Sequence, residues 1–244
     1  MATHLARKLH QAEHRILCVY SRGKASAARL AREIGTTGTS RGDDLPSRAD
    51  FYILAVPDDA IPAVTEQFPE NRGIWLHTSG AVPVEVFSGR KEEYGVLYPI
   101  QSLSRDRELP AGGIPFLVEG SSPRVTSSVK QLAHSVSERV IVLDSNARLM
   151  VHLAAVFANN FSNHMVTIAR KILAGQGADP EMLVPLLKET FAKIEQMGAE
   201  RAQTGPAARG DEHTILRHLE LLGDDPDWKK IYTFISRDIQ KLRQ

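Results

Sequence analysis

One stretch of the chain carries four polar side chains at helical spacing. Arg148, His152, Asn159 and Asn163 follow one another at intervals of four, seven and four residues. At 100° per residue these positions fall in a single stripe along a helix. Histidine titrates near neutral pH and can give a proton to a developing oxyanion or amine. We therefore take His152, Asn159 and Asn163 as catalytic candidates and Arg148 as a candidate substrate contact.

The rest of that segment is too apolar for a freely solvated helix, since Leu149, Leu153, Phe157 and Phe161 lie between the polar positions. Buried amides and imidazoles need hydrogen-bond partners. The stripe is thus expected to face a cleft. A structural hydrogen-bond network and a seam between two subunits remain open as alternatives.

A basic turn follows the first apolar run. Ser21, Arg22 and Lys24 come directly after the run that ends at Tyr20, and no acidic residue accompanies them. In dinucleotide-binding folds an acid at this place binds the ribose 2′-hydroxyl of NAD, whereas a cation accommodates the 2′-phosphate of NADP. Arginine grips phosphate through two parallel hydrogen bonds. These three residues predict an NADP(H) site, with a solvated basic turn as the alternative.

Two further strand ends carry small or polar residues. Ala55, Val56 and Pro57 close one apolar run, and His77 and Thr78 close the next. Open α/β sheets bind ligands at the carboxyl ends of their strands. We expect these five residues to approach the nicotinamide half of the cofactor, although ordinary turn preferences would also explain them.

A loop in the second half of the chain contains two residues with no evident local role. Gly205 and Pro206 shape a tight loop, and Asp211 is placed to cap the helix that follows. These local roles leave Thr204 and Arg209 unexplained. Both are candidates for binding an anionic substrate group.

The elements that position these residues alternate in the first half. Apolar runs that predict strands alternate with segments of helical pattern, as a mostly parallel sheet requires. Continuous apolar runs also indicate strands covered on both faces. The predicted strands are 16–22, 51–56, 74–77, 96–98, 115–118 and 140–143, and the predicted helices are 1–10, 24–34, 58–68 and 125–137.

After Asp144 the strand signal ends. Helical patterns at 148–174, 180–196, 210–222 and 228–242 predict an all-helical second half. The sequence thus predicts an α/β domain at 1–144 and a helical domain at 145–244 that contributes to substrate binding.

Composition excludes several classes of protein. Among 244 residues the formal net charge is +1, so there is no basic excess for nucleic acid or a membrane surface. No apolar run approaches the roughly 20 residues that span a bilayer. A single cysteine, Cys18, makes no internal disulfide, which favours a reducing compartment and hence the cytoplasm. His213 and His218 lack the companions of a zinc site, so no metal is expected.

Taken together, the motifs resemble a family of NADP-dependent oxidoreductases that join a Rossmann-like domain to a helical C-terminal domain of unknown function. That family is distantly related to pyrroline-5-carboxylate reductase and 6-phosphogluconate dehydrogenase-like enzymes. The resemblance covers nearly the whole chain and is carried by 19–22, 55–59, 77–81, 98–99, 152–161, 188–190 and 203–207.

The resemblance implies hydride transfer between NADP(H) and a small carbonyl or imine, and a homodimer formed through the helical domain. It also implies a strand and a glycine-rich phosphate loop ahead of Thr3, with Ala2 as the last small residue of that loop. No Gly-x-Gly-x-x-Gly occurs in this sequence. Either translation starts upstream of Met1, or the chain has lost tight cofactor binding.

A second departure concerns the proton donor. The 6-phosphogluconate dehydrogenase relatives place a lysine one turn before an asparagine, where this chain has Ala155 before Asn159 and Val156 before Asn160. His152 is therefore the candidate general acid. Both departures also keep a rival open, a non-catalytic protein that senses a metabolite or nucleotide with the same fold.

Overall fold

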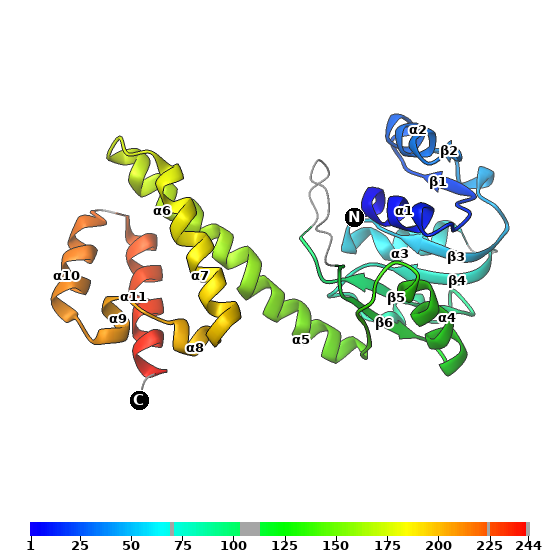
Figure 1. Cartoon of the computed structure of the whole chain (residues 1–244). Coiled ribbons are helices and arrows are strands. Elements are labelled where there is room, and N and C mark those ends of the chain that lie inside the picture. The colour runs from blue at the N-terminus through cyan, green and yellow to red at the C-terminus, as the bar shows by residue number, and fades with distance from the viewer. Residues whose placement is uncertain (69–70, 103–112, 224, 243–244) are drawn as a thin grey trace. The chain divides into compact units, whose positions relative to one another are not determined.

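The computed structural model describes residues 1–68, 71–102, 113–223 and 225–242. Contacts within the chain divide it into two compact units, Met1–Asn160 and Phe161–Gln244. The first is an α/β unit and the second is made of helices (Figure 1). The division falls 16 residues beyond the expected boundary at residue 144, which marks the end of the α/β secondary structure. That functional boundary stays a prediction.

The strands of the α/β unit form two sheets. A small sheet pairs β1 with β2 in parallel, and a larger sheet has the order β3-β4-β5-β6-β7. Within the larger sheet β5 and β6 are antiparallel, whereas the other pairs are parallel. The strands are β1 (Cys18–Tyr20), β2 (Thr37–Thr39), β3 (Arg48–Leu54), β4 (Arg72–His77), β5 (Tyr94–Pro99), β6 (Phe116–Gly120) and β7 (Val140–Val142).

Helices pack on the sheets and share the apolar core with the strands. They are α1 (Ala2–Gln11), α2 (Lys24–Glu33), α3 (Ile61–Gln67) and α4 (Pro123–His134), with short 3₁₀ turns at Gly42–Asp44, Asp58–Ala60 and Val84–Phe87. Leu5 and Leu9 of α1 pack with Leu76, Leu97 and Val129 in the largest cluster. All six strands and all four helices expected in this half are present. The expected mostly parallel sheet is confirmed as well.

Strand β2 is the one strand among the described residues that the sequence did not reveal. Its three residues, Thr-Gly-Thr, have no apolar run, so no local pattern indicates a strand. Gly38 is needed there because a Cβ would meet the Ala27 carbonyl oxygen of α2 at 2.8 Å. Close packing of α2 on β2 therefore explains the glycine at position 38. This contact can be recognised only in the tertiary structure.

The long helix after Asp144 is interrupted by a π-helical segment. Helix α5 (Ser145–Ala155) leads into the π segment Val156–Phe161 and then into α6 (Ser162–Gly175), drawn as one ribbon in Figure 1. The expected helix over 148–174 is confirmed, but the assumption of 100° per residue fails between Val156 and Phe161, because i→i+5 bonding widens the turn. Asn159 therefore leaves the phase that an ideal α-helix would give it.

The helical unit continues with a 3₁₀ turn (Pro180–Leu183), α7 (Val184–Met197), α8 (Ala199–Ala202), α9 (Pro206–Arg209), α10 (Glu212–Leu221) and α11 (Pro226–Lys241). Its core is thin. Within 161–223 and 225–242 the only buried residues are Ala207, Ala208, Ile215 and Ser236. In the portion of the chain that the structure describes, no helix has the length and apolarity needed to cross a membrane.

Candidate functional site

The carboxyl end of β5 brings Tyr98 to the candidate acid His152. The Tyr98 hydroxyl lies 3.0 Å from His152 Nδ1, and the two rings meet edge to face at 5.9 Å. Tyr98 is buried, and His152 is partly exposed. Burial raises the pKa of the Tyr98 phenol, and the nearby Asp58 carboxylate raises it further. Tyr98 therefore stays protonated at neutral pH and can donate to the imidazole.

Gly80 makes room for this pair. A Cβ at position 80 would lie 2.7 Å from both His152 Nδ1 and Tyr98 Cζ, closer than side chains can approach. The loop after β4 thus has to pass beside the pair without a side chain. Gly80, Tyr98 and His152 belong to three separate elements of one unit. The contact between them is therefore formed by the tertiary fold of the α/β unit.

The loop after β4 is itself fixed by hydrogen bonds. The Thr78 amide donates to the Leu54 carbonyl oxygen at 3.2 Å, which ties the ends of β3 and β4 together. The Ser79 hydroxyl oxygen accepts hydrogen bonds from the amides of Ala81 and Val82. These bonds fix the loop at the carboxyl edge of the sheet as a platform, and Gly80 of the same loop adjoins His152.

His77 is buried beneath that platform. It is fully buried, and its Nδ1 accepts a hydrogen bond from the Ser79 amide at 3.2 Å. Burial, with the charge of Arg148 adding to it, lowers the pKa of His77 to about 3. The imidazole is neutral at physiological pH, so His77 and Thr78 can present backbone atoms to a ligand, whereas the His77 ring lies inside the protein.

Arg148 lies in a buried ion pair. Its side chain is 1% exposed and its guanidinium pairs with Glu119 of β6. Its Nη2 also donates to the Val82 carbonyl oxygen at 2.7 Å. Ser145 completes the network, because its amide and hydroxyl both donate to Glu119. This arrangement favours a structural role for Arg148, which anchors the start of α5, over the substrate contact that its spacing suggested.

The basic turn after β1 is exposed. Arg22 and Lys24 are exposed, and across the described ranges neither has a carboxylate within 4.0 Å. Helix α2 begins here at Gly23 without a side-chain cap and without an acidic residue in its first turn. The first amides of a helix and two cations favour bound phosphate. The predicted contact of Ser21, Arg22 and Lys24 with the 2′-phosphate of NADP stays a prediction.

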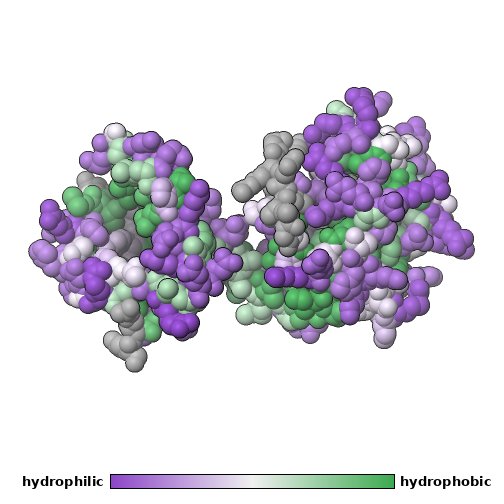
Figure 2. Space-filling model, viewed as in Figure 1, coloured by the Kyte–Doolittle hydropathy of each residue, from purple (hydrophilic) through white to green (hydrophobic). Residues whose placement is uncertain are grey.

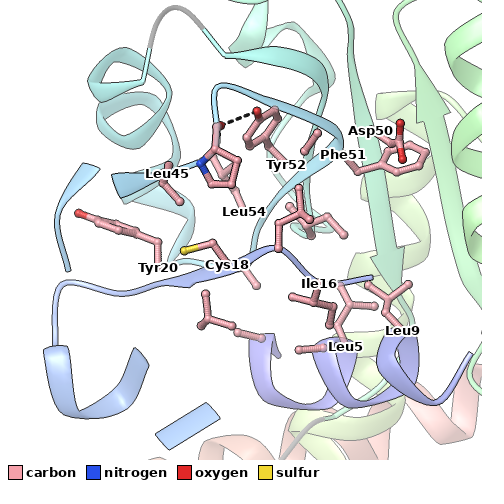
Figure 3. Close-up of a pocket in the computed structure, with 18 of the residues that line it drawn as sticks. Leu5, Leu9, Ile16, Cys18, Tyr20, Leu45, Asp50, Phe51, Tyr52 and Leu54 are labelled. Carbon is pink, nitrogen blue, oxygen red and sulfur yellow. Dashed lines mark hydrogen bonds between the residues drawn. The ribbon is translucent and has the colours of Figure 1, made fainter. Parts of the chain in front are cut away.

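Ala55, Val56 and Pro57 follow β3 as expected, and all three are at least partly exposed. Ala55 and Val56 line a cavity of about 600 Å³ between β1 and β3 (Figure 3). These small and apolar residues leave the backbone accessible at the strand end. The arrangement is compatible with the predicted approach of a nicotinamide ring, which stays a prediction.

The remaining candidates are exposed. Asn159 is the last candidate in the α/β unit, and its amide nitrogen lies 3.3 Å from the Asn160 side-chain oxygen. Asn163, Thr204 and Arg209 belong to the helical unit, where Thr204 lines a groove between α6 and α11 and Arg209 lies 4.0 Å from Asp211. Their predicted roles in catalysis and substrate binding stay predictions.

The expected burial of the long helix is wrong within these units. Leu149, Met150 and Leu153 of α5 are 44–63% exposed, and on that helix Arg148 is the buried side chain. The sequence reasoning also did not name Tyr98 as a site residue. The signal was available, since Tyr98 lies near the carboxyl end of β5, where α/β folds place their ligands.

Comparison with protein families identifies both halves. Residues 1–98 match the Rossmann-like domain, and residues 114–239 match a domain of unknown function (DUF2520). No curated protein matches the sequence.

Solved structures agree with the family match. A Bacteroides fragilis protein named as a candidate NADP oxidoreductase is 37% identical, with a TM-score of 0.91 over 98% of this chain and 94% of that chain. A Thermotoga maritima protein is 26% identical, with a TM-score of 0.79 over 99% and 96%. The 1-pyrroline-5-carboxylate reductase of Streptococcus pyogenes, 12% identical with a TM-score of 0.64 over 99% and 95%, shares the fold. The chain therefore belongs to the family that joins a Rossmann-like domain to the DUF2520 domain, as the sequence motifs predicted.

Proposed function

We propose that this protein is an NADP(H)-dependent oxidoreductase that transfers a hydride to or from a small carbonyl or imine compound. The observation that carries the proposal is the Tyr98–His152 pair at the carboxyl edge of the sheet. In α/β folds this edge is where cofactor and substrate meet. A relative with 37% identity that is named as a candidate NADP oxidoreductase supports it.

Cofactor binding would rest on two groups of residues. Ser21, Arg22 and Lys24 would hold the 2′-phosphate, since the cations are exposed and lack acidic partners in the described portion of the chain. The strand ends Ala55–Pro57 and His77–Thr78 would contact the nicotinamide half through their backbones. The bound nicotinamide supplies or accepts the hydride.

His152 would handle the proton. The imidazolium form would donate its Nδ1 proton in a hydrogen bond to the Tyr98 oxygen and pass its Nε2 proton to a substrate oxygen or nitrogen. The imidazole left behind is neutral, and its Nδ1 can then accept a hydrogen bond from the Tyr98 hydroxyl. Tyr98 acts as a positioning residue in this scheme. Asn159 and Asn163 would bind the substrate's polar group, and Thr204 and Arg209 would bind an anionic group.

Titration with NADPH and NADH tests the cofactor. We expect NADPH to bind at least tenfold more tightly than NADH, and Arg22→Ala to remove that preference. Arg32→Ala is the matched control, because Arg32 is an exposed arginine at the other end of the same helix. If neither NADPH nor NADH binds, the proposal is wrong.

Turnover tests the proton donor. With a panel of small aldehydes, ketones and cyclic imines, we expect His152→Ala to lower kcat at least a hundredfold. Tyr98→Phe should shift the pH profile of kcat with a smaller loss of rate, because it changes the hydrogen bond on Nδ1 and leaves Nε2 in place. Unchanged turnover in His152→Ala would remove His152 from the mechanism.

The alternative is a non-catalytic sensor of a metabolite or nucleotide. It is favoured by the absence of a Gly-x-Gly-x-x-Gly motif from the sequence and by Ala155, which stands where related dehydrogenases have lysine. Tight nucleotide binding with no hydride transfer to any compound of the panel would support the sensor over the enzyme.

We further propose that two chains associate through their helical domains. The thin core of this unit supports the idea, since Leu186, Ile194 and Met197 of α7 are 37–61% exposed. Apolar side chains also reach the surface of the helical unit in Figure 2. Exposed apolar patches of this kind mark association sites.

Analytical ultracentrifugation tests the association. We expect a dimer at micromolar concentration, and monomers after the double change of Leu186→Ser and Ile194→Ser. The control is Lys188→Ser with Glu195→Ser, which alters exposed polar positions of the same helix. A monomeric wild-type chain would contradict the proposal. The expected cytoplasmic location, which rests on the single Cys18, is also a proposal.

A further inference from the structure

The first turn of α5 is attached to the loop after β4 by two hydrogen bonds. The Val84 amide donates to the Ser145 hydroxyl oxygen at 2.9 Å. Arg148 Nη2 donates to the Val82 carbonyl oxygen at 2.7 Å. This is the loop whose glycine makes room for the candidate acid His152. The start of the helix and the acid that the helix carries therefore contact the same loop.

The Glu119 carboxylate orients both side chains that make these bonds. One of its oxygens accepts from the Ser145 amide at 3.0 Å, and the other accepts from the Ser145 hydroxyl at 2.9 Å and from Arg148 Nη1. A hydroxyl has one proton, so its donation to Glu119 leaves the Ser145 oxygen free to accept from the Val84 amide. Hydrogen bonds to a charged acceptor are also stronger than those between neutral groups. Glu119 thus fixes the direction in which Ser145 and Arg148 bind the loop.

Glu119 and Tyr98 project from one face of the sheet. In the antiparallel pair of β5 and β6, Tyr98 lies opposite Leu117, and Val96 lies opposite Glu119. Directly opposed side chains lie on the same face, and so do residues two apart in one strand. The cluster that contains Tyr98, Val96 and Leu117 also packs against Val151 of α5. Helix α5 therefore lies on the face that carries Glu119 and Tyr98.

The helix meets this face at two points. Arg148 and His152 are four residues apart, and α-helical geometry holds throughout Ser145–Ala155, so both project from the same side of α5. Arg148 pairs with Glu119 at one point. His152 meets Tyr98 at the other. Two contacts about 6 Å apart along the axis fix both the rotation of the helix and its position along the sheet.

The two contacts differ in how firmly they are held. The Arg148 side chain is 1% exposed and the Glu119 side chain 14%. His152 is partly exposed, and across the described ranges its side chain has one hydrogen bond, to Tyr98. Separation of a buried ion pair is costly because it leaves a charge uncompensated. The buried contact therefore decides where the helix lies, and the imidazole follows it.

We propose that Glu119, acting through Ser145 and Arg148, is a positioning residue that holds His152 Nδ1 at the Tyr98 hydroxyl. This role rests on the proposed function, in which His152 transfers the proton. A catalytic side chain has to be held within about 0.5 Å of its productive geometry, and the residues behind it provide that precision. Loss of the contacts at Ser145 should lower the rate of proton transfer and leave cofactor binding unchanged.

Nitrogen-15 NMR of the unliganded full chain tests the position of the imidazole. The chain is labelled at its nine histidines, and the His152 signal is assigned by its loss in His152→Gln. At a pH at which this signal shows a neutral imidazole, we expect Ser145→Ala to reproduce at least half of the Nδ1 shift that Tyr98→Phe causes. Both changes weaken the same hydrogen bond. Ser145→Thr keeps a hydroxyl and should restore the wild-type signal.

The matched control is Ser122→Ala, which removes the serine cap of α4 in the same unit. It should lower stability by a similar amount and leave the His152 signal in place. Circular dichroism verifies that each variant is folded. If Ser145→Ala does not fold, Glu119→Gln replaces it with the same readout and the same scoring, because the neutral amide is a weaker acceptor for Ser145 and Arg148.

Turnover of the carbonyl and imine panel supplies the second readout. We expect Ser145→Ala to lower kcat by about tenfold or more, since small displacements of a catalytic group are costly. The Kd of NADPH should change by less than about twofold. Ser145→Thr should recover most of the rate, and Ser122→Ala should keep the wild-type kcat.

An unchanged His152 signal in Ser145→Ala, where Tyr98→Phe moves it, would overturn the positioning role and leave the proposed function standing. Equal losses of kcat in Ser145→Ala and Ser122→Ala would also overturn it, because reduced stability would then explain both. If no compound of the panel is turned over, the proposed function fails, and the NMR comparison alone decides whether Glu119 and Ser145 position the imidazole.

Discussion

The two units of this chain differ in how much of their apolar surface they bury. The α/β unit buries large apolar side chains such as Trp75, Phe87 and Phe116 in three clusters around the larger sheet, and it pairs the buried Arg148 with Glu119. Among the described residues of the helical unit, three apolar residues are buried, and leucine and phenylalanine side chains of α7 and α11 are exposed. The α/β unit therefore has an extensive apolar core of its own, whereas the helical unit leaves most of its apolar side chains partly or fully exposed.

Removal of the buried Arg148 side chain is expected to have the largest effect on the stability of the α/β unit. We expect Arg148→Met to lower the free energy of unfolding of the α/β unit by about 3–5 kcal/mol, because Glu119 is left charged and unpaired. Arg22→Met, at an exposed position, should change it by less than about 0.5 kcal/mol. Chemical denaturation checks both.

The double variant Arg148→Met with Glu119→Gln separates charge from packing. We expect it to recover more than half of the lost stability, since no uncompensated charge remains. A double variant as unstable as Arg148→Met alone would show that packing, rather than the ion pair, explains the loss.

The pH dependence of stability should also differ between the units. Because burial lowers the pKa of His77 to about 3, the unfolded chain binds one more proton than the folded chain between that value and pH 6.5. The α/β unit is thus most stable above pH 6.5 with respect to this group, and should lose up to about 1.4 kcal/mol per pH unit as the pH falls. Denaturation between pH 7 and 4.5 measures the slope, and His77→Gln should flatten it. An unchanged slope in His77→Gln would assign the acid sensitivity to other groups.

Two glycines sharpen the comparison further. Gly80→Ala should cost about 1–3 kcal/mol, since the new methyl group collides with Tyr98 and His152. Gly175→Ala, at the end of α6, meets no atom within 4 Å and should be neutral or slightly stabilising. Differential scanning calorimetry compares them, and equal destabilisation would show that the Tyr98–His152 contact is not tight.

The smallest expected effect lies in the helical unit. The Asp225 carboxylate accepts hydrogen bonds from the amides of Asp227 and Trp228 and so caps α11. Asp225→Ala should cost about 1 kcal/mol, and Asp225→Asn only a few tenths, because asparagine caps equally well. Amide exchange in α11 measures both. A loss as large for asparagine as for alanine would point to charge rather than capping.

The sequence predicted the secondary structure well and the site less completely. Apolar runs and the turn residues between them are local signals, and they located β3, β4, β6 and the longer helices near their observed bounds, but not the four-residue helices α8 and α9. The short β2 has no such signal, because its glycine is required by close packing against α2, which is a tertiary contact. The π segment at 156–161 was likewise invisible, since residue spacing does not report hydrogen-bond phase.

The candidate site residues differ in how far their environment depends on residues that are distant in the sequence. Strand-end positions such as Arg22 and Ala55 follow from the rule that ligands meet the carboxyl edge, and they lie where that rule places them. Arg148 was predicted as a substrate contact because its spacing matched His152, and that role stays a prediction. Spacing alone could not show that Glu119, 29 residues earlier, would neutralise it.

The sequence alone determined the order of most elements, the family and the position of the basic turn. These features depend on hydrophobic periodicity and on the residues at strand ends, and both are patterns among residues that are close together in the chain. The tertiary structure decided which polar groups are available. It buried His77 and Arg148, brought Tyr98 to His152 across 54 residues, and left an open space between β1 and β3. These outcomes depend on which distant segments share a core, and burial and pairing between such segments are properties of the folded chain.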